Sequence, residues 1–181
     1  MERLGESLAP EELVALAKKS GAKSIAYTYN DPVIFWEYAR DVALLAKREN
    51  IKSVAVTAGY ISSSAHEDFF SVMDAANIDL KSFDDNFYRR LTGGRLAPVL
   101  ETLEYVAKQS DTWLEVTTLL IPGENDSPGE LEALTSWVVE HLGPHVPLHF
   151  SAFHPDWKME QHQATSLEIL LKARAIEIGR A

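Results

Sequence analysis

The feature that most constrains the fold of this chain is a series of five short apolar runs, separated by helical patterns. The runs lie at residues 24–28, 53–56, 76–78, 113–116 and 147–150. Strand-length runs that alternate with helices predict successive βα units joined in one parallel sheet. Right-handed crossovers bring the carboxyl ends of parallel strands to a single edge. In such folds that edge carries the functional site, and each run here ends in a polar cluster.

Periodic apolar residues with capping residues at their ends predict helices over residues 10–20, 33–49, 64–73, 84–91, 96–109, 128–142 and 165–178. A closed eight-stranded barrel needs ~200 residues or more, and this chain has 181. We therefore predict an α/β fold, a partial (β/α) barrel formed by an open parallel arc of about five strands with outer helices. Residues 1–181 are expected to form one domain. Because a helix stands at each end, we expect that a first strand and a last strand are missing.

Composition excludes several classes of function. The net charge of −10 argues against a nucleic-acid partner or an anionic membrane surface, since phosphate binding needs a basic stripe. No run approaches the roughly 18 apolar residues of a transmembrane helix, and no signal-peptide core follows Met1. We expect a cytoplasmic protein. The chain has no cysteine, which excludes disulfides, thiolate zinc sites and cysteine-held iron–sulfur clusters for the sequence as given.

Asp79 and Lys81 form the clearest polar pair, at the end of the third run. Two residues apart on a strand, their side chains face the same side. Isolated buried charges are costly, so the two must pair, bind a cation or bind a charged ligand. Two interpretations stay open. One is a structural ion pair, and the other is a carboxylate-binding Lys81 beside an Asp79 that binds a cation or a hydroxyl.

Other clusters have an ordinary interpretation beside a functional one. Asn30 and Asp31 lie in a Tyr-Asn-Asp-Pro sequence that is also typical of a turn or helix cap. Gly59 would let the backbone approach a ligand closely, or it belongs to a plain βα turn. His154, beyond the fifth run, is a candidate for ligand binding or proton transfer. We expect a structural role for His149 and surface positions for the remaining histidines, His66, His141, His145 and His162.

Six motifs in order carry a family resemblance. They are YTYNDP at 27–32, VTAGY at 56–60, NIDLK at 77–81, PVLET at 98–102, LEVTTLLIPGEND at 114–126 and FHPDWKM at 153–159. Over about residues 8–178 the chain closely resembles the radical SAM enzymes related to pyruvate formate-lyase-activating enzyme, in particular the AmmeMemoRadiSam-system group. The resemblance implies a partial (β/α) barrel that holds S-adenosylmethionine (SAM) over the carboxyl ends of its strands.

The resemblance also implies roles for single residues. Asn30 and Asp31 match the element that cradles the methionine amino group, although the family usually has Glu where this chain has Asp31. Thr57 matches a position near the bound methionine, where the next residue is usually Asn and is Ala58 here. Asp79 and Lys81 match an Asp-x-Lys element whose Lys would pair with the SAM carboxylate.

The remaining implied contacts lie further along the chain. Pro122 matches the loop beside the adenine, and His154 matches a histidine near the SAM ribose or carboxylate. Gly59 and Thr117 complete the predicted cofactor-binding set. We assign no catalytic residue and no metal ligand within this chain.

One departure from the family is large. Its chemistry needs a Cys-x-x-x-Cys-x-x-Cys loop holding a 4Fe–4S cluster, whose electron cleaves SAM to a 5′-deoxyadenosyl radical. This sequence contains no such loop. We expect the chain alone to be inactive and the cluster to belong to a longer native form, which would use an electron donor and a protein or small-molecule substrate.

Two alternatives stay open. The chain could be a cluster-less module that binds SAM or another nucleotide, or an unrelated hydrolase that uses Asp79 and His154 with a metal. For any of these functions, a bare edge of the parallel sheet predicts a homodimer or aggregate.

Overall fold

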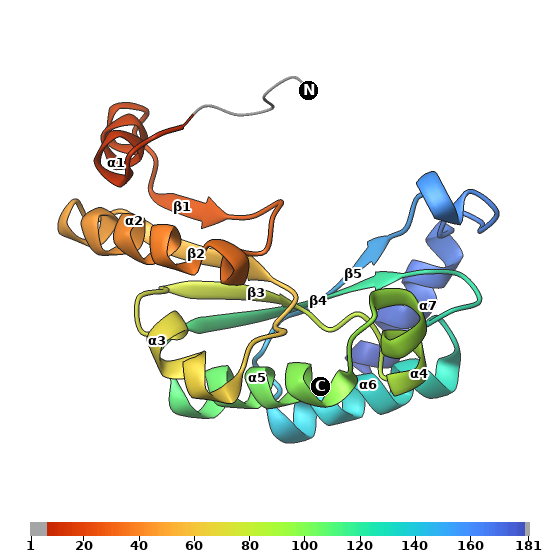
Figure 1. The fold of residues 1–181 in the computed structure, drawn as a ribbon. Helices are drawn as coiled ribbons and strands as arrows, with labels where there is room; N and C mark the ends of the chain where they lie inside the picture. The colour runs from red at the N-terminus through yellow and green to blue at the C-terminus, as the bar shows by residue number, and fades with distance from the viewer. Residues whose placement is uncertain (1–6, 180–181) are drawn as a thin grey trace.

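The computed structural model describes residues 7–179 and contains one sheet of five parallel strands. The strands follow chain order across the sheet, from β1 to β5. Their bounds are β1 Ser24–Tyr27, β2 Lys52–Thr57, β3 Ala75–Asp79, β4 Trp113–Leu120 and β5 Leu148–Ala152. All four neighbouring pairs are parallel. The predicted α/β fold, an open parallel arc of about five strands with outer helices, is confirmed (Figure 1).

Helices connect successive strands. The α-helices are α1 Pro10–Lys19, α2 Trp36–Arg48, α3 His66–Phe70, α4 Asp85–Phe87, α5 Leu96–Gln109, α6 Pro128–His141 and α7 Leu167–Ile178. Shorter turns are η1 Pro32–Phe35, η2 Ser63–Ala65, the π-helical η3 Tyr88–Thr92 and η4 Trp157–Met159. In Figure 1, α3, α5 and α6 lie along the same face of the sheet. Among residues 7–179, no helix combines the length and apolar character needed to cross a bilayer.

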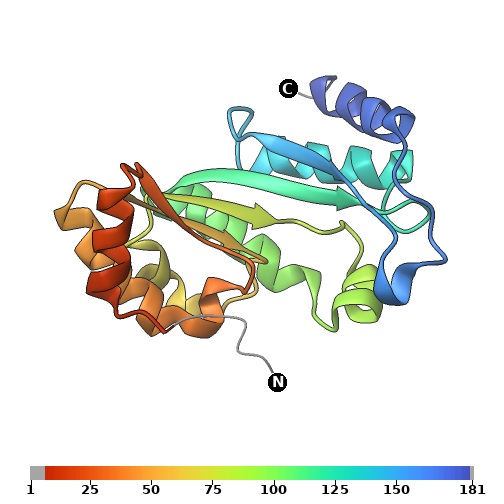
Figure 2. The ribbon, with the colours of Figure 1, turned by 90° about the horizontal axis from the view of Figure 1, so that it is seen from above.

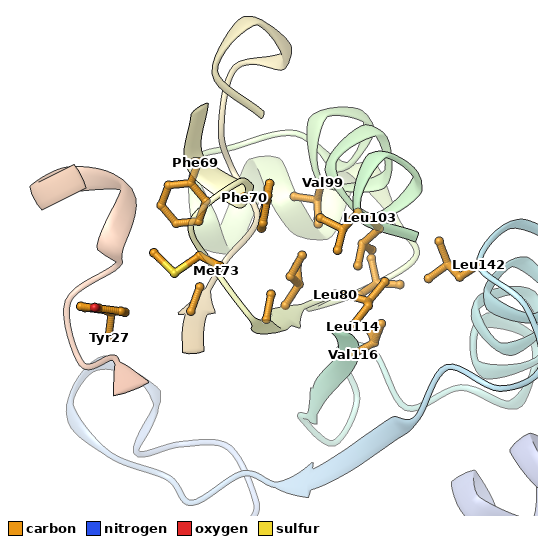
Figure 3. Packing of buried hydrophobic residues seen from close by; sticks show 14 of the residues in the cluster. Tyr27, Phe69, Phe70, Met73, Leu80, Val99, Leu103, Leu114, Val116 and Leu142 are labelled. Atoms are coloured by element: carbon orange, nitrogen blue, oxygen red, sulfur yellow. The ribbon is translucent and has the colours of Figure 1, made fainter. Parts of the chain in front are cut away.

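The core lies between the sheet and these helices. Alternate residues of β3 and of the segment after it, Ala76, Ile78 and Leu80, are buried, and the residues between them are partly exposed. Figure 3 shows Leu80 close to Val99 and Leu103 of α5. Fully burying such a side chain stabilises the fold by about 1.5–3 kcal/mol. The alternation fixes which face of the sheet meets the helices, and hence which residues face the opposite side.

Polar residues of β3 and β4 lie on that opposite face. Asn77 and Asp79 of β3 and Thr117 of β4 are half-buried there. Seen from above, the strands lie in front of α5 (Figure 2). Because all five strands run the same way, their carboxyl ends lie along one edge of the sheet, which we call the carboxyl rim. The predicted polar clusters follow the strands at this rim.

Several elements differ in length from the sequence prediction. The fourth strand was predicted to end at Val116, but β4 continues to Leu120 because its last residues pair with β5, with Leu119 opposite Ser151. The helix predicted over 64–73 is shorter, and α3 covers only His66–Phe70. The extension of β4 places Thr117 within a strand, rather than in the loop that follows it.

Candidate functional site

Asp79 and Lys81 form an ion pair at the carboxyl end of β3. The Lys81 Nζ atom lies 2.7 Å from Asp79 Oδ2, and about one third of each side chain is exposed. The prediction that the two face the same side is confirmed. A partly exposed ion pair stabilises a fold only modestly. An ammonium group has three donor hydrogens, so the one bond to Asp79 leaves Lys81 able to contact an anionic ligand.

The backbone around Lys81 is held on both sides. Its N–H donates to Tyr88 Oη at 3.0 Å, and its carbonyl accepts from Asn125 Nδ2 at 2.6 Å. The preceding carbonyl, of Leu80, accepts from Thr118 Oγ1 at 2.7 Å. Burial raises the pKa of Tyr88 to about 12, so the phenol stays neutral at physiological pH. Tyr88 and Asn125 were not predicted as site residues.

Asp31 joins the loop after β1 to the end of β2. Its Oδ1 accepts from the Val33 N–H at 3.0 Å and from Thr57 Oγ1 at 2.9 Å, and its Oδ2 accepts from the Ala58 N–H at 2.8 Å. The capping interpretation of Asp31 is therefore realised. A carboxylate has about four lone-pair sites, and with Thr57 Oγ1 also 3.0 Å from Oδ2, each oxygen of Asp31 already has two donor atoms within hydrogen-bond distance. Asn30 beside it is exposed.

Gly59 and Thr57 are buried just behind the rim. Gly59 has φ +66°, and a Cβ atom at this position would lie 2.7 Å from Ile78 Cγ2. The glycine is thus required by backbone conformation and by packing against β3, an internal reason that the sequence pattern did not reveal. The Gly59 N–H donates to Thr57 Oγ1 at 3.1 Å. Thr57 is 3% exposed, so its hydroxyl supports Asp31 from below.

A ladder of polar contacts crosses the uncovered face below the rim. Asn77 Nδ2 donates to Thr117 Oγ1 at 2.8 Å, so the hydroxyl of that predicted site residue already accepts one hydrogen bond within the sheet. Nearer the start of β4, Glu115 contacts His149 Nε2 at 2.8 Å and accepts from Trp113 Nε1 at 3.0 Å. The indole and the imidazole hold the pKa of Glu115 below its ordinary value. This pairing agrees with a structural role for His149.

The loop after β4 contains Pro122, which is half-buried. Glu124 in the same loop is bound by the Arg90 guanidinium and by His162 Nε2, the latter at 3.0 Å. Hydrogen bonds from these two groups hold the pKa of Glu124 below its usual range. His154 has a mostly exposed side chain that pairs with Asp156 at 3.2 Å. The loops after β4 and β5 are thus tied together through Glu124.

The surface prediction for His66 is wrong. The side chain is 2% exposed, and its Nε2 lies 3.0 Å from Thr102 Oγ1 of α5. Its ring lies 4.8 Å from that of Tyr105, measured between centroids. His66 therefore belongs to the contact between α3 and α5. His162, which pairs with Glu124, is half-buried rather than fully exposed.

Comparison with known proteins identifies the family. A sequence model described as the radical SAM superfamily matches residues 1–134, well over half of the chain. The chain belongs to the radical SAM superfamily. A similar relative of this radical SAM domain is an uncharacterised protein of Methanocaldococcus jannaschii, 38% identical over 174 residues. That match covers 95% of this chain and 51% of the relative.

A second relative is the 4-hydroxyphenylacetate decarboxylase activating enzyme of Clostridioides difficile, 24% identical over 152 residues, with 80% of this chain and 47% of that protein covered. The radical SAM domain thus spans about half the length of these curated relatives.

Solved structures agree on the fold. A domain of pyruvate-formate lyase-activating enzyme from Bacteroides vulgatus superposes with a TM-score of 0.74 at 16% identity, covering 86% of this chain and 93% of that one. Streptococcus suis SuiB bound to S-adenosylmethionine gives a TM-score of 0.75 at 12% identity, covering 99% of this chain and 43% of SuiB. At such identities, the likeness concerns the fold alone. It supports the partial barrel inferred from the strand pattern.

The superfamily's two cofactors, SAM and the iron–sulfur cluster, need different side chains. Three cysteine thiolates are needed for an iron–sulfur cluster of this family, and the 181 residues contain none, so they do not fit the cluster. Within residues 7–179, no three His, Asp or Glu side chains converge to hold a metal ion. One cationic side chain, Lys81, lies at the carboxyl rim, paired with Asp79.

Proposed function

We propose that this chain is the SAM-binding core of a radical SAM enzyme. The observation that carries the proposal is the Asp79–Lys81 pair, with the Lys81 backbone fixed on both sides at the carboxyl rim of a radical SAM domain. A partly exposed ammonium whose main chain cannot shift suits a small anionic group. In this proposal Lys81 binds the SAM carboxylate, and Asp79 holds the Lys81 ammonium in place.

In the same proposal, the other predicted site residues contact further parts of SAM or support the residues that do. Asn30 and Asp31 contact the methionine amino group. Pro122 lies beside the adenine, and His154 contacts the ribose or carboxylate. Gly59, Thr57 and Thr117 support the site from within the protein, because their contacts are with other residues of the chain.

Radical chemistry would need groups outside this sequence. In a longer form, a cysteine loop would supply the cluster and an electron donor would reduce it. We propose that the 181 residues alone make no radical, because they offer no thiolate. The substrate of the longer form would be a protein glycyl site or a small molecule. One superfamily neighbour, SuiB, has been crystallised with its precursor peptide SuiA.

Calorimetry with S-adenosylhomocysteine tests the proposal, because this ligand keeps the carboxylate and the adenine. We expect binding to the unaltered chain, weakened about tenfold by Lys81→Met, since a charge-assisted contact is lost. Lys172→Met is the matched control, because Lys172 also pairs with a carboxylate, that of Glu168, but on α7. Absence of binding, or equal weakening by both variants, would overturn the proposal.

A second candidate is a cluster-less module that binds SAM or another nucleotide without redox chemistry. The lack of any cysteine in the sequence favours it. The 5′ end of the native transcript separates the two. An open frame that continues upstream into three spaced cysteines supports the radical enzyme, whereas a transcript that starts at Met1 supports the module.

A further inference from the structure

Asn125 is a polar side chain near the rim that makes three hydrogen bonds. It is 1% exposed, in the loop that follows β4. Its Oδ1 accepts from the Ile121 N–H at 2.7 Å. Its Nδ2 donates to the carbonyls of Lys81 at 2.6 Å and Leu119 at 2.9 Å. A primary amide has two donor hydrogens and one carbonyl oxygen, and in Asn125 both hydrogens and the oxygen form hydrogen bonds.

These bonds occur where strand pairing ends. The register of β3 with β4 runs as far as Asp79 opposite Thr117. Lys81 therefore lies beyond the ladder, and the Asn125 amide takes over the connection between the two chain segments. Buried main-chain groups need a partner, and the Asn125 side chain supplies one to Lys81 from 44 residues away.

The same side chain also shapes the loop that carries Pro122. By accepting from the Ile121 N–H and donating to the Leu119 carbonyl, it fixes the turn directly before Pro122. One buried amide thus links the segment of the carboxylate-binding lysine to the segment proposed to lie beside the adenine.

We infer that Asn125 is a positioning residue, which sets the place of Lys81 relative to the Ile121–Gly123 loop so that one SAM molecule reaches both. The inference rests on the proposed function. Asn125 does not touch the ligand but acts through Lys81.

Asn125→Asp is the sharpest variant. The carboxylate keeps the shape of the amide and can still accept from the Ile121 N–H. It has no donor hydrogen for the carbonyls of Lys81 and Leu119, so each of these oxygens then faces another acceptor. Because the Ile121 N–H can still bond to residue 125 within the loop while the bond across to Lys81 is lost, we expect the end of β3 to shift more than the loop. If Asn125→Asp does not fold at neutral pH, Asn125→Ala serves in the same comparison.

The test compares two nucleosides by calorimetry on the full chain. S-adenosylhomocysteine reaches both ends of the proposed site, whereas 5′-methylthioadenosine lacks the carboxylate. We expect Asn125→Asp to weaken S-adenosylhomocysteine about tenfold and to leave 5′-methylthioadenosine within about twofold, as Lys81→Met does. The double variant should bind no more weakly than Lys81→Met alone, because residues that act as a unit are not additive.

A residue with a merely structural role would give another pattern. Both nucleosides would weaken in proportion, and the double variant would show the sum of the single losses; either result would overturn the inference. Thr135→Val is the control, since it removes a buried hydrogen bond to the Leu131 carbonyl within α6. It should leave the ratio of the two affinities unchanged.

Hydrogen exchange of the ligand-free chain separates this inference from the proposed function. We expect Asn125→Asp to speed exchange of the Lys81 and Ser82 amides, and Thr135→Val to leave them unchanged. If the unaltered chain binds neither nucleoside, the proposed function fails, and exchange alone decides whether Asn125 places Lys81. Unchanged exchange at those two amides would contradict the positioning role.

Discussion

At the scale of single residues, Asp31 shows how one carboxylate can organise a rim. Its carboxylate accepts from the Val33 N–H after β1, from the Ala58 N–H after β2 and from the buried Thr57 hydroxyl. Asp31→Ala leaves the Ala58 N–H and that hydroxyl without their acceptor. We expect the free energy of unfolding to fall by about 1–3 kcal/mol, measured by urea denaturation. Asp41→Ala, at an exposed position in α2, should change it by less than about 0.5 kcal/mol.

His66 gives a pH prediction at the same scale. Burial lowers its pKa below the ordinary 6.5, against a smaller opposing effect of Glu101. The unfolded chain therefore binds a proton near pH 6.5 while the folded chain does not. The contribution of His66 to stability is fully present above pH 6.5 and falls as the pH drops toward the folded pKa.

Urea denaturation at pH 7.5, 6.5 and 5.5 checks this. We expect His66→Gln, which keeps a polar group for Thr102, to flatten the loss of stability between pH 6.5 and 5.5. Parallel pH profiles for the two proteins would show that another group causes the loss.

At the scale of elements, α6 stabilises the segment after β3 through one residue of its first turn. Glu130 Oε1 accepts from both Ser82 Oγ and the Phe83 N–H, the latter at 2.9 Å. Glu130→Gln keeps that oxygen, whereas Glu130→Ala removes it from a fully buried serine. We expect Glu130→Ala to lower the free energy of unfolding by about 1–3 kcal/mol and Glu130→Gln by much less. Equal losses in chemical denaturation would mean that the charge matters more than the hydrogen bonds.

Element existence was predictable from this sequence, but element ends and distant contacts were not. The period of apolar residues and the caps at Asp31, Ser127 and Ser166 place most helices. The end of β4 depends on pairing with β5, which no pattern in 113–120 contains. Asp79 and Lys81 were found because two-residue spacing on a strand fixes a shared face.

Asn125 and His66 were missed for a different reason. The side chain of Asn125 bonds to a carbonyl 44 residues away, and His66 meets a threonine 36 residues away. The spacing of neighbouring residues in the sequence gives no information about partners so far along the chain. An Asn within IPGEND is typical of a turn, and a lone His in a short helix pattern is typical of a surface position. Only the packing of one βα unit on the next gives either residue its role.

At the scale of the whole molecule, helices and loops cover some parts of the sheet and leave others open. α3, α5 and α6 cover one face, whereas β1 lies at one end of the strand order and pairs only with β2 among the described strands (Figure 1). In natural proteins, charged residues or proline in an edge strand usually prevent it from pairing with another chain. The four residues of β1, SIAY, contain neither. The outer side of β1 is therefore open to pairing with another chain.

We predict that this chain forms dimers or larger assemblies through β1, despite its net charge of −10. Light scattering at high protein concentration measures the mass. Ala26→Lys places a charge on the exposed part of β1 and should shift the population toward monomer, because strand pairing would then bury an ammonium. Ala133→Lys, at an exposed position of α6, makes the same exchange away from the edge and should leave the mass unchanged. A monodisperse monomer before any substitution would contradict the prediction, and an equal response to both lysines would place the contact elsewhere.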